Sequence, residues 1–171
     1  MPTAEAGRAR ARIDFPGDGS AAVATGIPVL DHLLGLMARR GSLDVEVEAA
    51  PGEAASEAAA CGRALGDALG QALGAEGVRG AGSGHGVADE ALAQVVLEAS
   101  GRPLVVSNVD LSAARVAGLD TDVVAGFLHA VADEAGLTLH VRLIEGTETE
   151  HVLDAIFKAL GAALGQALST T

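Results

Sequence analysis

The spacing of apolar positions along the chain predicts strands and helices in a regular order. Apolar side chains between Val29 and Met37 recur with the helical period, with Pro28 just before them and Gly41 shortly after. Residues 43–48 instead alternate between apolar and acidic side chains, which is the period of a strand. The same criteria predict strands over 11–15, 21–25, 43–48, 91–99, 104–109 and 138–144, and helices over 29–39, 57–73, 121–134 and 149–168.

An internal repeat relates the two parts of the chain. The segment Ala68–Leu73 reads Ala-Leu-Gly-Gln-Ala-Leu and returns unchanged, 95 residues later, as Ala163–Leu168. Because such a repeat decides the architecture, we predict one internally duplicated α+β domain over 1–171. Its similar halves, 8–76 and 87–171, each have a small β-sheet and two helices, with the helices sandwiched between the sheets. Five glycines within 77–86 predict a connecting loop.

Composition excludes several classes of function. The chain has 23 acidic and 11 basic residues, a net charge of -12, which argues against a nucleic-acid partner. The single cysteine cannot form an internal disulfide or a cysteine-rich zinc site. No apolar run is long enough to span a membrane, and residues 1–5 lack the pattern of a secretory signal. We therefore expect a cytoplasmic protein without a membrane partner.

Histidines offer the clearest candidates for chemistry. His32 lies near a helix start, His140 lies in a strand, and Glu150-His151 begins a helix with Asp154 three residues further on. Residues three or four apart share one face of a helix, so the second helix start can direct an imidazole and two carboxylates at one ion. Manganese, zinc and iron accept such ligands. The alternative is an acidic helix start without an ion, stabilised by the helix dipole.

Several blocks of sequence resemble the imidazoleglycerol-phosphate dehydratase family of histidine biosynthesis, from about Arg8 to Leu168. The blocks are Thr25-Gly26-Ile27-Pro28-Val29-Leu30-Asp31-His32-Leu33-Leu34, Asp89-Glu90-Ala91-Leu92, Ser100-Gly101-Arg102-Pro103, Asp120-Thr121-Asp122, Thr138-Leu139-His140 and Phe157-Lys158-Ala159-Leu160. The resemblance implies a ribosomal protein S5 domain 2-like fold and a large homo-oligomer built from trimers. It also implies a manganese-dependent hydro-lyase that converts imidazole glycerol phosphate to imidazole acetol phosphate, with two ions between neighbouring subunits.

The resemblance also assigns roles to individual residues. His32 and His140 match metal ligands of the family, and Glu150, His151 and Asp154 stand at a helix start where the family has His, His and Glu. The residues that match phosphate contacts are Arg79, Arg102 and Lys158. The candidates for a catalytic base are Asp89 and Glu90.

The other set of family metal ligands is missing. A second His-His-x-x-Glu helix start falls on Ala55, Ser56 and Ala59, and the repeat maps the helix start at 150–154 onto the same three positions. None of these side chains carries an imidazole or a carboxylate. Three functions therefore stay open: a manganese-dependent dehydratase with an altered site, a metal-free and non-catalytic structural or ligand-binding homologue, and a different enzyme that uses a single ion.

Overall fold

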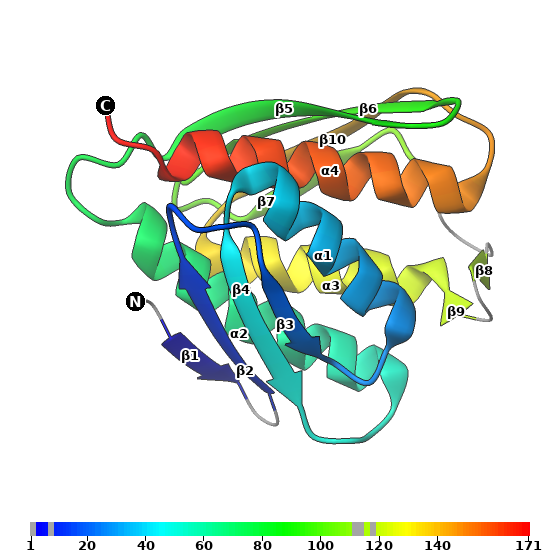
Figure 1. The fold of residues 1–171 in the computed structure, drawn as a ribbon, viewed down its shortest axis with the longest axis horizontal. Coiled ribbons are helices and arrows are strands. Elements are labelled where there is room, and N and C mark those ends of the chain that lie inside the picture. The colour runs from blue at the N-terminus through cyan, green and yellow to red at the C-terminus, as the bar shows by residue number, and fades with distance from the viewer. Residues whose placement is uncertain (1–2, 7–8, 111–114, 117–118) are drawn as a thin grey trace.

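The computed structural model describes residues 3–6, 9–110, 115–116 and 119–171. The strands are β1 (Thr3–Ala6), β2 (Ala9–Asp14), β3 (Ala21–Ala24), β4 (Asp44–Ala49), β5 (Ala81–Ala88), β6 (Ala91–Glu98), β7 (Leu104–Ser107), β8 (Arg115–Val116), β9 (Leu119–Asp120) and β10 (Thr138–Glu145). The helices are α1 (Pro28–Gly41), α2 (Ala54–Leu73), α3 (Thr121–Ala135) and α4 (Thr149–Leu168). Two four-stranded sheets enclose the four helices, and β8 and β9 form a separate small ribbon (Figure 1).

The two halves repeat one topology. The first sheet has the strand order β1-β2-β4-β3 and the second has the order β5-β6-β10-β7. In each sheet the strand at one edge runs parallel to its neighbour, β3 to β4 and β7 to β10, while the other pairs are antiparallel. Helices α2 and α4 both have 20 residues, and their bounds differ by the offset found in the sequence. The predicted α+β class, the duplication and the sandwiched helices are therefore confirmed.

The loop predicted over 77–86 is wrong for most of its length, because β5 begins at Ala81. Glycine usually weakens a strand, but here Gly82, Gly84 and Gly86 alternate along the strand face that is buried against α4. A Cβ atom on Gly86 would lie 2.0 Å from the carbonyl oxygen of Ala155. Glycine therefore allows the strand to lie directly on the helix, where any side chain would be excluded.

The hydrophobic core lies between the layers. Helix α1 packs on α4 and helix α2 packs on α3, and the rings of Phe127 and Phe157 meet with their centroids 6.3 Å apart. Cys61 is fully buried in the same core, and this burial raises the pKa of its thiol to about 11. No helix in the described ranges is both long enough and apolar enough to cross a membrane.

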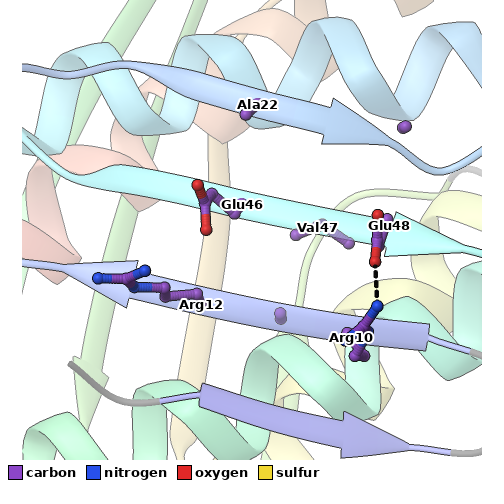
Figure 2. Close-up of a pocket in the computed structure, with 8 residues that line it drawn as sticks. Arg10, Arg12, Ala22, Glu46, Val47 and Glu48 are labelled. Atoms are coloured by element: carbon purple, nitrogen blue, oxygen red, sulfur yellow. Dashed lines mark hydrogen bonds and ion pairs between the residues drawn. The ribbon is translucent and has the colours of Figure 1, made fainter.

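The outer face of the first sheet carries charged side chains in two rows. Arg10 and Arg12 on β2 are in register with Glu48 and Glu46 on β4, and Arg10 forms an exposed ion pair with Glu48 at 2.8 Å (Figure 2). The small side chains of β3 leave a shallow hollow of about 550 Å³ beside these rows. An antiparallel pair with one solvated face normally shows this alternation, and none of the predicted site residues lies here.

Substitution of Gly86 tests the close contact between β5 and α4. We expect Gly86→Ala to lower the free energy of unfolding by about 1–3 kcal/mol, because the added methyl group forces the strand away from the helix. The matched control is Gly126→Ala in α3, where a Cβ atom meets nothing within 4 Å and where alanine favours the helix by about 1 kcal/mol. Urea unfolding of both variants measures the difference. Equal destabilisation by the two substitutions would contradict the assigned contact.

Candidate functional site

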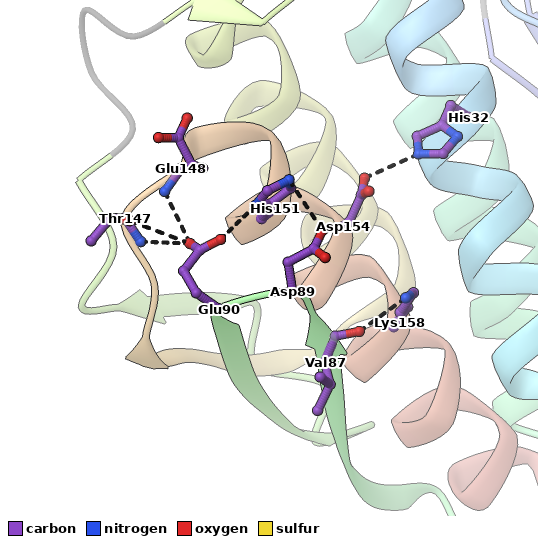
Figure 3. A network of polar contacts seen from close by, with 9 residues as sticks. All are labelled: His32, Val87, Asp89, Glu90, Thr147, Glu148, His151, Asp154 and Lys158. Atoms are coloured by element: carbon purple, nitrogen blue, oxygen red, sulfur yellow. Dashed lines mark hydrogen bonds and ion pairs between the residues drawn. The ribbon is translucent and has the colours of Figure 1, made fainter.

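The β5–β6 hairpin delivers two carboxylates to the start of α4 (Figure 3). Asp89 and Glu90 form the two-residue turn between the paired strand ends Ala88 and Ala91. Asp89 has a φ of 49°, and tight hairpin turns require this left-handed region, which Asp adopts more readily than most residues. The sequence Asp-Glu therefore suits both the turn and the site beside it.

Glu90 caps α4 from a different segment of the chain. Its Oε2 atom accepts hydrogen bonds from the backbone N–H groups of Thr147, at 2.9 Å, and Glu148, at 3.1 Å. The residue at the N-cap position, Glu148, makes no side-chain cap of its own, so the hairpin satisfies donors that the helix start leaves open. The pKa of Glu90 is lowered to about 2 by its hydrogen bonds. The one from the Thr147 N–H has the largest effect, followed by those with His151 and with the Glu148 N–H.

His151 is held between the two carboxylates of the hairpin. Its Nδ1 atom lies 2.5 Å from Oε1 of Glu90, and its Nε2 atom lies 3.2 Å from Oδ2 of Asp89. Since ionised carboxylates only accept hydrogen bonds, the arrangement favours a ring that donates from both nitrogens. The hydrogen bond to Glu90 is the main cause that raises the pKa of His151 above its ordinary value.

A second imidazole–carboxylate pair joins α1 to α4. Nε2 of His32 lies 3.1 Å from Oδ1 of Asp154 (Figure 3). The start of α1 is itself fixed by Asp31, whose Oδ1 accepts hydrogen bonds from the backbone N–H and the hydroxyl of Thr25. His32, Asp154 and the exposed Glu150 line one hollow of about 210 Å³ between the two helices.

Lys158 lies one turn after Asp154 on α4 and contacts β5. Its Nζ atom donates a hydrogen bond to the carbonyl oxygen of Val87 at 2.9 Å. Figure 3 places Lys158 on the same side of the helix as Asp154, within the group formed with His32 and the hairpin. Of the three residues predicted to contact phosphate, Lys158 therefore lies with the candidate residues near the start of α4.

The other predicted residues lie at the opposite end of β5. Arg79 and His140 line a hollow of about 520 Å³ on the outer face of the second sheet, together with Thr138 and others; we call it the Arg79 hollow. Arg102 adjoins it, because its carbonyl oxygen accepts a hydrogen bond from the Thr138 hydroxyl. The eight residues of β5 separate this end from the hairpin, which amounts to about 23 Å. The structure thus brings the predicted site residues together in two groups.

The start of α2 does not fit a manganese ion. Ala55 and Ser56 are exposed and Ala59 is half-buried, so methyl groups and one hydroxyl stand at the positions that the family fills with donors. The neighbouring carboxylates in the sequence are those of Glu53, which is exposed at the N-cap position, and Glu57, which is 7% exposed and faces Gly26. In the described part of the chain, no three His, Cys, Asp or Glu side chains are arranged to hold a metal ion. An ion at the α2 start of any copy would meet the same alanines, because every copy has the same sequence.

Comparison with known proteins identifies the family of this chain. The family model for imidazoleglycerol-phosphate dehydratase matches residues 25–164. The chain belongs to this family. It is 37% identical over 163 residues to the imidazoleglycerol-phosphate dehydratase of Clostridium botulinum (strain Kyoto / Type A2), covering 93% of this chain and 83% of the relative. The corresponding protein of Desulfitobacterium hafniense (strain Y51) is 41% identical over 166 residues, which are 94% of this chain and 84% of the relative.

Solved structures of dehydratases share the fold. The crystal structure of imidazoleglycerol-phosphate dehydratase from Staphylococcus aureus superposes with a TM-score of 0.86 at 34% identity, covering 95% of this chain and 94% of the other. The enzyme from Pyrococcus furiosus, solved in complex with (S)-C348, superposes with a TM-score of 0.84 at 24% identity, covering 99% of this chain and 94% of the other. At this low identity the similarity supports the fold alone. The family resemblance predicted from the sequence blocks is confirmed.

Sequence reasoning missed two contacts that build the α4 start. The cap from Glu90 and the pair of His32 with Asp154 both join segments far apart in the chain. One signal for the first contact was available, because Asp89-Glu90 separates two segments by a hairpin turn of two residues. The hairpin was not predicted, because the glycine-rich sequence of its first strand, β5, is typical of a loop.

The pairing of His151 with Glu90 makes the stability of the α4 start depend on pH. The pKa of Glu90 is lower in the folded protein than in the unfolded chain, where it is 4.5. Glu90 therefore stabilises the fold at pH values above 4.5, and this stabilisation is lost as the pH falls toward about 2. The pKa of His151 is higher in the folded protein than in the unfolded chain, where it is 6.5. His151 therefore stabilises the fold at pH values below 6.5, and this stabilisation is lost as the pH rises through the pKa of the folded protein. The contact is therefore strongest between pH 4.5 and 6.5.

An NMR titration of the histidine rings tests this pairing. We expect the pKa of His151 to lie above 6.5 and to fall toward that value in Glu90→Gln, because the neutral amide no longer favours the charged ring. Glu98→Gln, at the far end of β6 from the turn, is the control and leaves the pKa of His151 unchanged. A His151 pKa that does not respond to Glu90→Gln would show that the two side chains are not paired in solution.

Proposed function

We propose that this chain binds a small phosphorylated imidazole, the class of compound that its dehydratase relatives act on, as part of histidine biosynthesis. The observation that carries the proposal is the Arg79 hollow, in which a guanidinium and an imidazole line one depression of a family member. A guanidinium matches a phosphate group with two parallel hydrogen bonds. Glu98 also lines the hollow and can accept a hydrogen bond from the N–H of an imidazole ligand.

Neighbouring copies of the chain complete the site in this proposal. Within one chain, about 23 Å of strand separates Arg79 from the hairpin, and about 16 Å separates it from His140, which is in register with Ser83 through Val96. A ligand of this size cannot contact both groups of candidate residues over these distances. His140 lies in register between Val96 and Val106 on the outer face of the second sheet. These valines are 43% and 42% exposed, and neighbouring apolar side chains on a surface favour a protein partner. In this proposal a homo-oligomer covers this face and places the α4 start of another copy close to His140.

The second candidate function is the dehydration reaction itself. It is favoured by the retained His32, His140 and His151 and by identities of 37–41% to proteins named as dehydratases. The reaction needs a base that removes a proton from carbon. Of the two candidates, Glu90 is a weak base because its hydrogen bonds lower its pKa to about 2. Asp89, which contacts His151, is then the stronger candidate.

Calorimetric titration with imidazole glycerol phosphate tests the proposed binding. We expect saturable binding by the full chain, and a loss of at least about tenfold in affinity for Arg79→Ala, since hydrogen bonds to charged groups contribute roughly 1.5–3 kcal/mol. Arg63→Ala, which removes an exposed arginine of α2, is the matched control and retains affinity.

Two outcomes of the same experiment would contradict the proposal. Absence of binding by the unaltered chain would overturn it, and so would an equal loss of affinity in both arginine variants. Analysis of the incubated samples for imidazole acetol phosphate separates the two candidate functions. Accumulation of that product would support the dehydratase, and recovery of intact ligand would support binding without turnover.

A further inference from the structure

We infer that this chain binds no manganese at the starts of α2 and α4, because α2 lacks the donors and those of α4 are bound to one another by direct side-chain contacts. The inference deepens the proposed function, on which it rests for the location of the site. It departs from the family, whose resemblance implies two ions per subunit.

At α2 the donors are absent and no other side chain replaces them. Ala55 and Ser56 face solvent, so a chelating side chain would have room there, but neither residue carries one. Glu57 lies on the same turn of the helix, yet its carboxylate is buried toward Gly26 and away from the exposed positions. Glu53 at the N-cap position is exposed, so the α2 start offers one carboxylate and the Ser56 hydroxyl but no imidazole. Manganese prefers several carboxylate, imidazole and water ligands, and this set does not supply them.

At α4 the donors are present but are bound to one another. Both ring nitrogens of His151 lie within hydrogen-bond distance of hairpin carboxylates, so neither faces an open position where an ion could bind. Asp154 is engaged with His32 of α1, and it is one carbon shorter than the glutamate that the family has at this position. Of the residues at the helix start, Glu148 and Glu150 keep side chains that are exposed and outside these pairs. Two solvated carboxylates without an imidazole are not the ligand set that the family resemblance implies.

The side-chain contacts join the elements that meet at this end of the molecule. The pair of His32 and Asp154 joins α1 to α4, and the contacts of His151 and of Glu90 with the α4 start join the hairpin to the same helix (Figure 3). No ion is needed to position these three elements. The stability of the fold is therefore expected to be independent of divalent metal.

Metal content measured on the unaltered protein and on a restored variant tests the inference. Each protein is incubated with manganese, desalted and analysed for manganese per chain. We expect essentially none for the unaltered chain, and the same melting temperature with and without chelator. The restored variant carries Ala55→His, Ser56→His, Ala59→Glu, Glu150→His and Asp154→Glu, and we expect it to retain manganese. The matched control, Arg63→His with Gln71→His, adds two imidazoles to exposed positions two turns apart on α2 and retains none.

Each outcome decides the inference. One or two ions on the unaltered chain would overturn it, and so would a melting temperature that falls on chelation. A restored variant that folds, as judged by circular dichroism, but stays free of manganese would overturn the assignment to these five positions. If the restored variant does not fold, a second variant with only the three α2 substitutions replaces it. Titration with imidazole glycerol phosphate in the presence of chelator tests the proposed function separately, because failure to bind the ligand leaves the metal result unaffected.

Discussion

Backbone contact between β5 and α4 determines where the candidate site lies. Because Gly82, Gly84 and Gly86 carry no side chains, the strand lies directly on the helix along its length. The hairpin at the end of that strand then arrives at the first turn of α4, where Asp89 and Glu90 contact His151. A strand held further away by side chains would place those carboxylates beyond reach of the imidazole and of the helix N-terminus.

The two halves show that a scaffold can keep its form while the side chains at a helix start change. Helices α2 and α4 occupy equivalent places, have equal lengths and end in the same Ala-Leu-Gly-Gln-Ala-Leu sequence. Their first turns differ, with Ala55, Ser56 and Ala59 in one and Glu150, His151 and Asp154 in the other. Helix formation depends on the buried face and not on exposed side chains of the first turn, so the donors of α2 could disappear without loss of the fold.

Prediction from the sequence succeeded where a single periodic pattern decides the structure. The four helices and the repeat follow from apolar spacing and from one duplicated hexapeptide, and the family follows from blocks such as Leu30-Asp31-His32. The strand β5 could not be predicted in this way, because its buried face consists of glycines, which carry no apolar signal and usually mark loops. The pairs at the α4 start depend on which segments meet in space, and local periodicity does not contain that information.

The separation of the candidate residues also needed the structure. In the sequence, Arg79 stands ten residues before Asp89, and both are expected near one substrate. In the fold they lie at opposite ends of an extended strand, so they serve one ligand only if different copies of the chain contribute them. The missing donors of α2 remain missing in any such assembly, because every copy has the same alanines.

Electron paramagnetic resonance of free manganese most directly measures whether this site still binds metal. Aqueous manganese gives a sharp spectrum that weakens when the ion is bound by a protein, so a titration of the unaltered chain reports binding at equilibrium and without desalting. We predict that the spectrum keeps its full intensity as protein is added, because the α2 start lacks donors and those at α4 are paired with one another. A stoichiometric loss of the free signal would contradict this and would show that the chain has retained the metal chemistry of its family.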